Sequence, residues 1–142
     1  YLCPDKNIIY DSRVAYSLNC IILSENAGDQ YFPIPEGRNA KMSAFDMNVL
    51  IRLKHISNYS PKDISYLDHR RFISNADKKI YINKKDAYFE LNKLVKEIHQ
   101  KLWQDDKEKE GNLYYTEMLL FSIADRELYK DITERFCQII KH

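Results

Sequence analysis

The segment DAYFELNKLVKEIHQKLWQD, residues 86–105, carries the strongest helical pattern in the chain. Its apolar residues recur at intervals of three and four positions, which places them on one face of an α-helix. These residues are Leu91, Leu94, Val95, Ile98 and Leu102. His99 adjoins this row, so we expect it to pack at the edge of the buried face. The segment therefore predicts a long amphipathic helix from about Asp86 to about Asp105.

Further helices are expected from the same kind of pattern and from residues that favour helix ends. They cover about 11–24, 42–55, 61–71 and 113–140, the last with a break near Asp125. Asp11 or Ser12 is a favourable N-cap for the first helix, and Pro61 suits the first turn of the third. The stripes that the second and last helices are expected to bury contain Phe45, Val49, Leu50, Leu53, Met118, Leu119, Phe121, Leu128, Ile132, Phe136 and Ile139.

Two segments are not expected to be helical. Residues 29–41 contain Pro33 and Pro35, which do not fit a helix interior. Residues 79–83 (KIYIN) alternate in polarity and fit either a β-bridge or a merely extended chain. With only three Gly and four Pro, the sequence has too few turn residues for a many-stranded sheet fold. We therefore predict an all-α fold class, with residues 1–142 forming a single compact domain of about five to six helices.

The composition restricts the function classes. The formal net charge of +1 neither requires nor excludes an anionic partner. Cys3, Cys20 and Cys137 are odd in number and widely spaced, which argues against a disulfide framework and favours a reducing, cytoplasmic location. The four histidines show no metal-ligand spacing, and the chain has no P-loop, no Rossmann fingerprint and no apolar run of membrane-spanning length. We therefore expect no cofactor, no metal and no membrane association.

The densest polar group lies where the first helix is expected to begin, in Tyr10–Val14 (YDSRV). A carboxylate such as that of Asp11 is stabilised there as an anion by the unpaired amides and the dipole of the helix N-terminus. Such an anion can stabilise positive charge that develops at the anomeric carbon of a glycosidic bond. The alternative is structural, because Asp or Ser before a helix commonly serves as its cap alone. From spacing alone, the cap is the favoured interpretation.

The stretch Pro4–Val14 (PDKNIIYDSRV) resembles a segment of the helix–hairpin–helix DNA glycosylases, particularly the bacterial 8-oxoguanine glycosylase-like branch. In that superfamily an extended piece ends in an aspartate, and the next helix begins with a small or polar residue followed by Val. Glu117–Phe121 (EMLLF) and Pro35–Asn39 (PEGRN) resemble further segments of these bacterial relatives. The resemblance implies a DNA base-excision function, with double-stranded DNA as the partner. It also implies that Asp11 is the catalytic residue and stabilises the oxocarbenium-like sugar.

The resemblance further implies DNA contacts and a missing part. Arg13, Arg38 and Asn39 are the residues expected to contact phosphates or bases. The Gly-rich hairpin that grips DNA in the family lies upstream of the aspartate, as does the lysine nucleophile of the bifunctional members. This chain begins at Tyr1. We therefore expect it to be the downstream part of a longer protein, and to be inactive as a glycosylase by itself.

A basic cluster supports a second interpretation. Its members are His69, Arg70, Arg71, Lys78, Lys79, Lys84 and Lys85. Positive side chains interleaved with an aromatic one, here Tyr81, can follow a phosphate backbone. Charge runs are nevertheless more often solvated faces. The cluster, and His69, Arg70 and Arg71 in particular, fits the alternative function of a non-catalytic helical module that binds nucleic acid or a protein partner.

Overall fold

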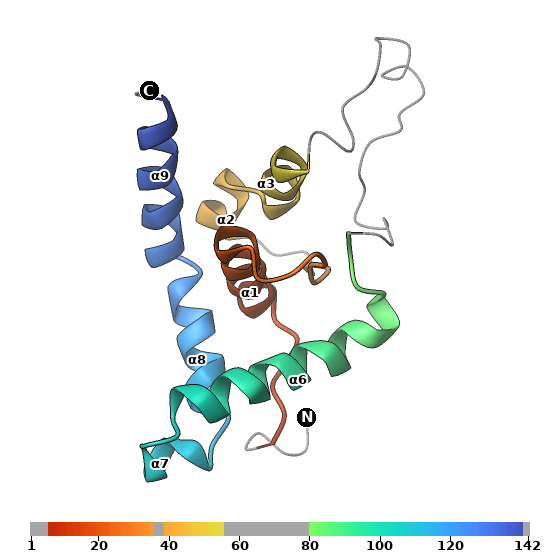
Figure 1. Cartoon of the computed structure of the whole chain (residues 1–142), viewed down its shortest axis with the longest axis vertical. Coiled ribbons are helices and arrows are strands. Elements are labelled where there is room, and N and C mark those ends of the chain that lie inside the picture. The colour runs from red at the N-terminus through yellow and green to blue at the C-terminus, as the bar shows by residue number, and fades with distance from the viewer. Residues whose placement is uncertain (1–5, 36–38, 56–79, 141–142) are drawn as a thin grey trace.

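The computed structural model describes residues 6–35, 39–55 and 80–140, and these residues are mostly helical (Figure 1). They contain no β-strand, and the β-pairing found among them is an isolated parallel bridge between Tyr31 and Tyr81. The all-α fold class is therefore confirmed. For the segment 79–83 the sequence fitted either a β-bridge or an extended chain, and Tyr81 within it forms the bridge. The helix predicted over 61–71 lies outside the described residues.

Helix α1 (Ser12–Glu25) lies at the centre of the fold (Figure 1). Asp11 caps its N-terminus, as the sequence suggested, and Asn26 ends it in the left-handed conformation with φ of 52°. Asn adopts this conformation more readily than most residues. Helices α8 (Tyr114–Ile123) and α3 (Met47–Lys54) both pack against α1. Because other helices contact α1 on more than one side, seven consecutive residues of α1 are buried.

The strongly patterned segment forms helix α6 (Lys84–Leu102), which Asn83 caps (Figure 1). Leu91 and Val95 are completely buried, whereas Leu102 is 47% exposed, so the predicted apolar seam ends before the last turn. The charged connector that follows contains the short helix α7 (Lys107–Glu110). The chain then continues through α8 into α9 (Glu127–Ile140), and the break expected near Asp125 lies between these two helices.

The helix expected over 42–55 is two helices, α2 (Ala40–Ala44) and α3. The break occurs because the Asp46 side chain accepts hydrogen bonds from two backbone amides of the following turn and so begins a new helix there. The predicted stripe is wrong in part: Val49 is 48% exposed, and Leu53 is also exposed. The buried residues of α3 are Met47 and Ile51, one helical turn apart.

The predicted stripe of α8 is also wrong in part, because Met118 and Leu119 are exposed. The buried face of this helix instead contains Thr116, Glu117 and Leu120. Two of these three side chains are polar, and both are hydrogen-bonded to other segments. A pattern of apolar residues therefore could not locate this face.

Two hydrophobic clusters form the core, and α1 contributes to both. The first joins α1 to α2, α3, α9 and the Tyr31–Tyr81 bridge; its largest members include Tyr16, Met47 and Ile51. The second joins the opposite side of α1 to α6 and α8, with Leu18 and Leu91 among its members. The two clusters place the N-terminus of α1 close to α2 and α8, which is where the candidate site lies.

The segment after α1 is anchored by hydrogen bonds rather than by a sheet. The completely buried Asn19 donates to the Phe32 carbonyl and accepts from the Phe32 amide, both at 2.8 Å. The Tyr10 hydroxyl donates to the Pro33 carbonyl at 2.6 Å, and burial raises the pKa of this phenol, which keeps it a donor. These bonds determine the path of the chain toward α2.

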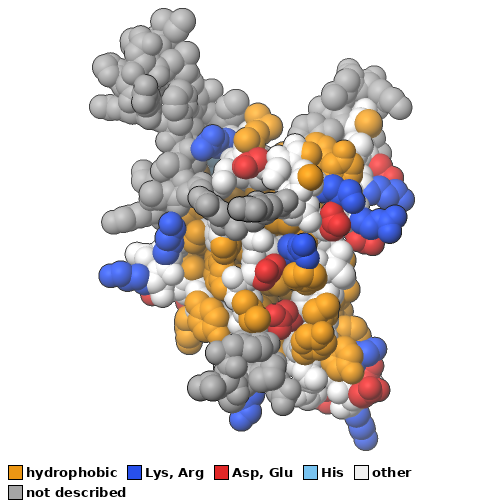
Figure 2. Space-filling model, turned by 180° about the vertical axis from the view of Figure 1, so that it is seen from behind, with side chains coloured by type: hydrophobic (Ala, Val, Ile, Leu, Met, Phe, Trp, Pro, Cys, Tyr) orange, Lys and Arg blue, Asp and Glu red, His pale blue; other side chains and the backbone are white. Residues whose placement is uncertain are grey.

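The surface mixes apolar and charged side chains. On the face shown in Figure 2, patches of hydrophobic side chains lie among acidic and basic side chains, some single and some grouped. The exposed apolar residues of the described chain include Ile9, Phe89, Met118 and Leu119. Among the described helices, none is both long enough and apolar enough to cross a membrane.

Candidate functional site

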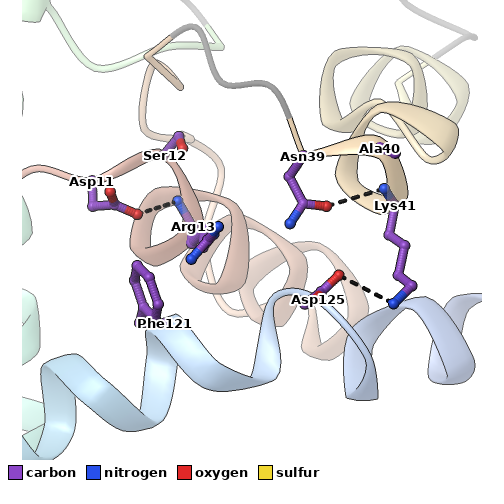
Figure 3. A pocket seen from close by; sticks show the side chains of 8 residues that line it. All are labelled: Asp11, Ser12, Arg13, Asn39, Ala40, Lys41, Phe121 and Asp125. Carbon is purple, nitrogen blue, oxygen red and sulfur yellow. Dashed lines mark hydrogen bonds and ion pairs between the residues drawn. The ribbon is translucent and has the colours of Figure 1, made fainter.

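A pocket of about 610 Å³ opens where the N-termini of α1 and α2 meet α8 (Figure 3). Helix α1 contributes its cap and first turn, α2 contributes its cap and first turn, and α8 together with the following break contributes the remaining wall. The residues that line it are Asp11, Ser12, Arg13, Asn39, Ala40, Lys41, Phe121 and Asp125. Three predicted site residues, Asp11, Arg13 and Asn39, therefore share one pocket although they come from two separate segments.

Asp11 is half-buried at the mouth of α1. Its Oδ1 accepts a hydrogen bond from the Arg13 amide at 2.8 Å, which makes it the N-cap of this helix. Among the described residues, no donor contacts Oδ2. The carboxylate thus combines a capping role with one oxygen that can face a ligand in the pocket, and the helix N-terminus stabilises its negative charge.

The extended segment before Asp11 is held from two sides. The Ile8 amide donates to Asn92 of α6 at 2.8 Å, and the Ile9 amide donates to Glu117 of α8 at 3.3 Å. Both acceptor side chains are buried. Because three elements meet at this segment, the position of the Asp11 carboxylate relative to α8 is determined by tertiary contacts.

Arg13 lies over the aromatic ring of Phe121, with 4.3 Å between the guanidinium carbon and the ring centroid (Figure 3). A guanidinium in this position gains a cation–π contact and still has donors available to an anion. The ring limits the directions in which the side chain can move. Arg13 is consequently a preoriented cation at the wall of the pocket.

Helix α2 contributes the opposite wall. The side-chain oxygen Oδ1 of Asn39 accepts hydrogen bonds from the Lys41 and Met42 amides at 3.0 and 3.1 Å, so this side chain is the N-cap of α2. Figure 3 shows its amide nitrogen directed toward the space between α1 and α2. The Lys41 ammonium lies 3.5 Å from a carboxylate oxygen of Asp125, and both side chains are substantially exposed.

The pocket therefore contains two cations, two carboxylates, an amide and an aromatic ring. The ion pair between Lys41 and Asp125 is exposed, and such pairs contribute little to stability, so a competing anion could displace it at low cost. Arg13 and Lys41 can bind anionic groups, while Asp11 can stabilise a cationic centre. This arrangement suits a ligand that carries an anion next to a group that develops positive charge.

The remaining predicted residues are Arg38 and the members of the basic cluster. Arg38 lies outside the described residues, as do His69, Arg70, Arg71, Lys78 and Lys79. Lys84 and Lys85, the remaining members of the basic cluster, are exposed in the first turn of α6. The clustering of the predicted basic patch therefore stays a prediction.

Sequence reasoning missed Lys41 and Asp125 as pocket residues, and it assigned Phe121 to a buried stripe. Phe121 is half-buried and supports Arg13 instead. Nothing in the local sequence indicated Lys41 and Asp125, because they are paired by the packing of α2 near the break between α8 and α9.

No family model matches the chain, and no curated protein or solved structure matches it. The resemblance to DNA glycosylases consequently depends on the residues quoted for it and stays a prediction. The pocket has to be interpreted from its own chemistry.

Other chemistries find little support in the described part of the chain. No cluster of three or more His, Cys, Asp or Glu suited to a metal ion occurs among the described residues. Burial raises the pKa of the Cys20 thiol to about 11, so this cysteine is a poor nucleophile. Cys20 and Cys137 are both free thiols.

Proposed function

We propose that the pocket between α1, α2 and α8 is the DNA-contacting site of a glycosylase-like protein, with Asp11 as its catalytic carboxylate. One observation carries the proposal: Asp11, Arg13 and Asn39, chosen from two distant stretches of sequence, line the same open pocket. In this proposal the protein cleaves the bond between a base and its deoxyribose in double-stranded DNA.

The position of Asp11 supports the proposed chemistry. Cleavage of a glycosidic bond places positive charge on the sugar ring, and a fixed carboxylate lowers the energy of that state. Asp11 is held by its hydrogen bond to the Arg13 amide and by the anchored segment before it. A carboxylate that is already fixed loses little freedom when the transition state forms, and this favours catalysis.

The cations support a nucleic acid as the ligand. Arg13 and Lys41 line the pocket on either side of its opening and can each contact a phosphate oxygen. Asn39 adds an amide donor beside them. A duplex presents anionic phosphates around the sugar whose bond would break, so the same pocket could position the backbone and act on the sugar.

We expect Asp11→Asn to lower the rate of base release at least about a hundredfold, as removal of a charge-stabilising group does in other enzymes. Asn is as good an N-cap as Asp, so the free energy of unfolding should change little. The measurement is release of 8-oxoguanine from a labelled duplex by the full-length protein that the gene encodes, compared with duplexes containing uracil or an alkylated purine.

The matched control is Asp46→Asn, which alters an equivalent cap at the start of α3, away from the pocket. It should leave base release unchanged. If Asp11→Asn retained the wild-type rate, Asp11 would have no catalytic role. If the wild-type protein released none of the bases tested, the glycosylase proposal would be overturned.

One observation favours a second candidate, a non-catalytic interaction module: Asp11 is the N-cap of α1, a structural role that requires no ligand. Under this alternative Asp11→Asn has no functional effect, and Asp11→Ala costs about 1 kcal/mol of stability through loss of the cap. Thermal or urea unfolding of both variants, together with the base-release assay, separates the two candidates.

The role of Arg13 in DNA binding gives another expected result. Replacing it with Ala should reduce the slope of log Kd against log salt concentration by about 1, because one phosphate contact is lost. The affinity for duplex DNA is measured by fluorescence anisotropy over a salt series. Arg52→Ala removes an exposed cation of α3 outside the pocket and should leave the slope unchanged; equal slopes for all three proteins would contradict the proposal.

A further inference from the structure

A second and larger groove, of about 700 Å³, lies between α1 and α6, apart from the pocket at Asp11. Its apolar lining includes Ile21, Ile22, Ile82, Leu94 and Ile98. Ile21 is 37% exposed, and the other four are half-buried. The groove therefore exposes apolar surface from two helices and from the chain segment that leads into α6.

The rim of this groove is acidic. Asp29, Glu90 and Glu97 supply three carboxylates, whereas Lys93 supplies a single ammonium group. None of the three carboxylates forms an ion pair with another described residue. With three carboxylates and one ammonium group, the groove is therefore acidic on balance, in a chain whose formal net charge is +1.

The lining follows a helical repeat along α6. Glu90, Leu94, Glu97 and Ile98 are spaced three, four and seven to eight positions apart, so they follow one side of the helix for two turns. The charged residues Glu90, Lys93 and Glu97 are interspersed there with the apolar Leu94 and Ile98. A lined side of this length, about 12 Å at 1.5 Å per residue, can contact about two turns of another helix.

We propose that this groove binds a basic amphipathic helix of a protein partner. Grooves between two helices recognise the apolar face of a third helix through residues at positions i, i+3, i+4 and i+7. Lysine or arginine residues that flank such a face would reach Asp29, Glu90 and Glu97. The shape and the charge of the groove thus specify the same class of occupant, independently of the pocket at Asp11.

Gly28 provides a variant that fills the groove. It lines the groove, and its φ is not positive, so no backbone strain opposes a side chain there. A Cβ at this position would lie 3.7 Å from the Cγ2 atom of Ile22, an ordinary contact. Gly111 is the matched control, since a Cβ there meets no atom within 4 Å and it does not line this groove.

The test uses the full chain and two synthetic probes of about 18 residues, a length of five helical turns. The first is a helical peptide with leucine on one face and lysine on the other; the second has glutamate in place of every lysine. We expect the basic probe to bind at least tenfold more tightly than the acidic one. Gly28→Trp should weaken this binding at least tenfold, whereas Gly111→Trp should leave it unchanged. Circular dichroism establishes that both variants are folded.

Charge reversal tests the rim directly. The double variant Glu90→Lys with Glu97→Lys should weaken binding of the basic probe by roughly tenfold and strengthen binding of the acidic probe. Equal binding of the two probes by the wild-type chain would overturn the proposal, as would unchanged binding by Gly28→Trp. Self-association in sedimentation that Gly28→Trp abolishes would assign the groove to a second copy of this chain instead, and would also overturn it.

Discussion

Asn19→Leu should lower the free energy of unfolding by about 4 kcal/mol, the largest effect that we expect from a single substitution. Asn19 is completely buried in α1, and its side chain satisfies both the amide and the carbonyl of Phe32. Leucine has the same number of side-chain non-hydrogen atoms, with the same branch at Cγ, but its methyl groups are bulkier and cannot form hydrogen bonds. Two buried backbone groups are then left unpaired, and each costs about 1–3 kcal/mol.

Urea unfolding, followed by circular dichroism, measures this change. Ser17→Ala is the matched control, because Ser17 is equally buried in the same helix and donates one hydrogen bond, to the Leu120 carbonyl at 2.6 Å. It leaves one group unpaired rather than two, so we expect a loss of about 1–2 kcal/mol. Equal losses for the two variants would mean that the paired bonds to Phe32 do not determine the effect.

Asn19 also affects the candidate site indirectly. Phe32 is followed by Pro33, whose carbonyl accepts from the Tyr10 hydroxyl next to Asp11. The same segment leads toward Asn39 and α2. A destabilised Phe32 would therefore loosen the placement of both walls of the pocket, and base release should fall in Asn19→Leu even under conditions in which the variant remains folded.

Thr116→Val should lower the free energy of unfolding by about 3 kcal/mol, since it removes a buried hydroxyl that joins α8 to the C-terminal end of α6. The Thr116 hydroxyl lies 2.7 Å from Nδ1 of His99 and accepts from Nε1 of Trp103 at 3.0 Å. Nε2 of His99 donates to the Glu110 carbonyl at 2.9 Å, since a carbonyl can only accept. In the neutral imidazole, Nδ1 then accepts from the hydroxyl. Valine keeps the shape but leaves both ring partners unsatisfied.

Trp103 is the single tryptophan of the chain, so its fluorescence reports this network directly. We expect Thr116→Val to shift the emission to longer wavelength, because the indole N–H would bond to water instead. Thr116→Ser keeps the hydroxyl, so both the emission and the unfolding transition should stay close to those of the wild type. A red shift in Thr116→Ser as large as in Thr116→Val would show that the methyl group, not the hydroxyl, maintains the contact.

The same network explains one difference between expectation and structure. His99 was expected at the edge of a packed face, but it is 5% exposed and is bonded on both ring nitrogens. The apolar periodicity of α6 could not indicate this, because the partners come from α7 and α8. Buried polar side chains are hydrogen-bonded almost without exception, yet their partners cannot be identified from spacing.

The sequence by itself determined the fold class, the positions of the long helices and the cap of the first one. Asp11 before α1 and the apolar row of α6 act within one or two turns of chain, so their effects can be read locally. The same local patterns made Asp11 a candidate, whereas Arg13 and Asn39 became candidates through the resemblance to DNA glycosylases. Helix boundaries were less accurate where a single residue such as Asp46 ended one helix and began another.

The tertiary structure alone decided which helix faces are buried and which side chains meet. Met118 and Leu119 are apolar but exposed, whereas Thr116 and Glu117 are polar but buried, because α6 and the extended segment before α1 offer hydrogen-bond partners on that side. The pocket and the groove arise in the same way, from residues far apart in the chain that packing brings together. Contacts between distant segments depend on how all the helices pack together in the core, so a local sequence pattern does not predict them.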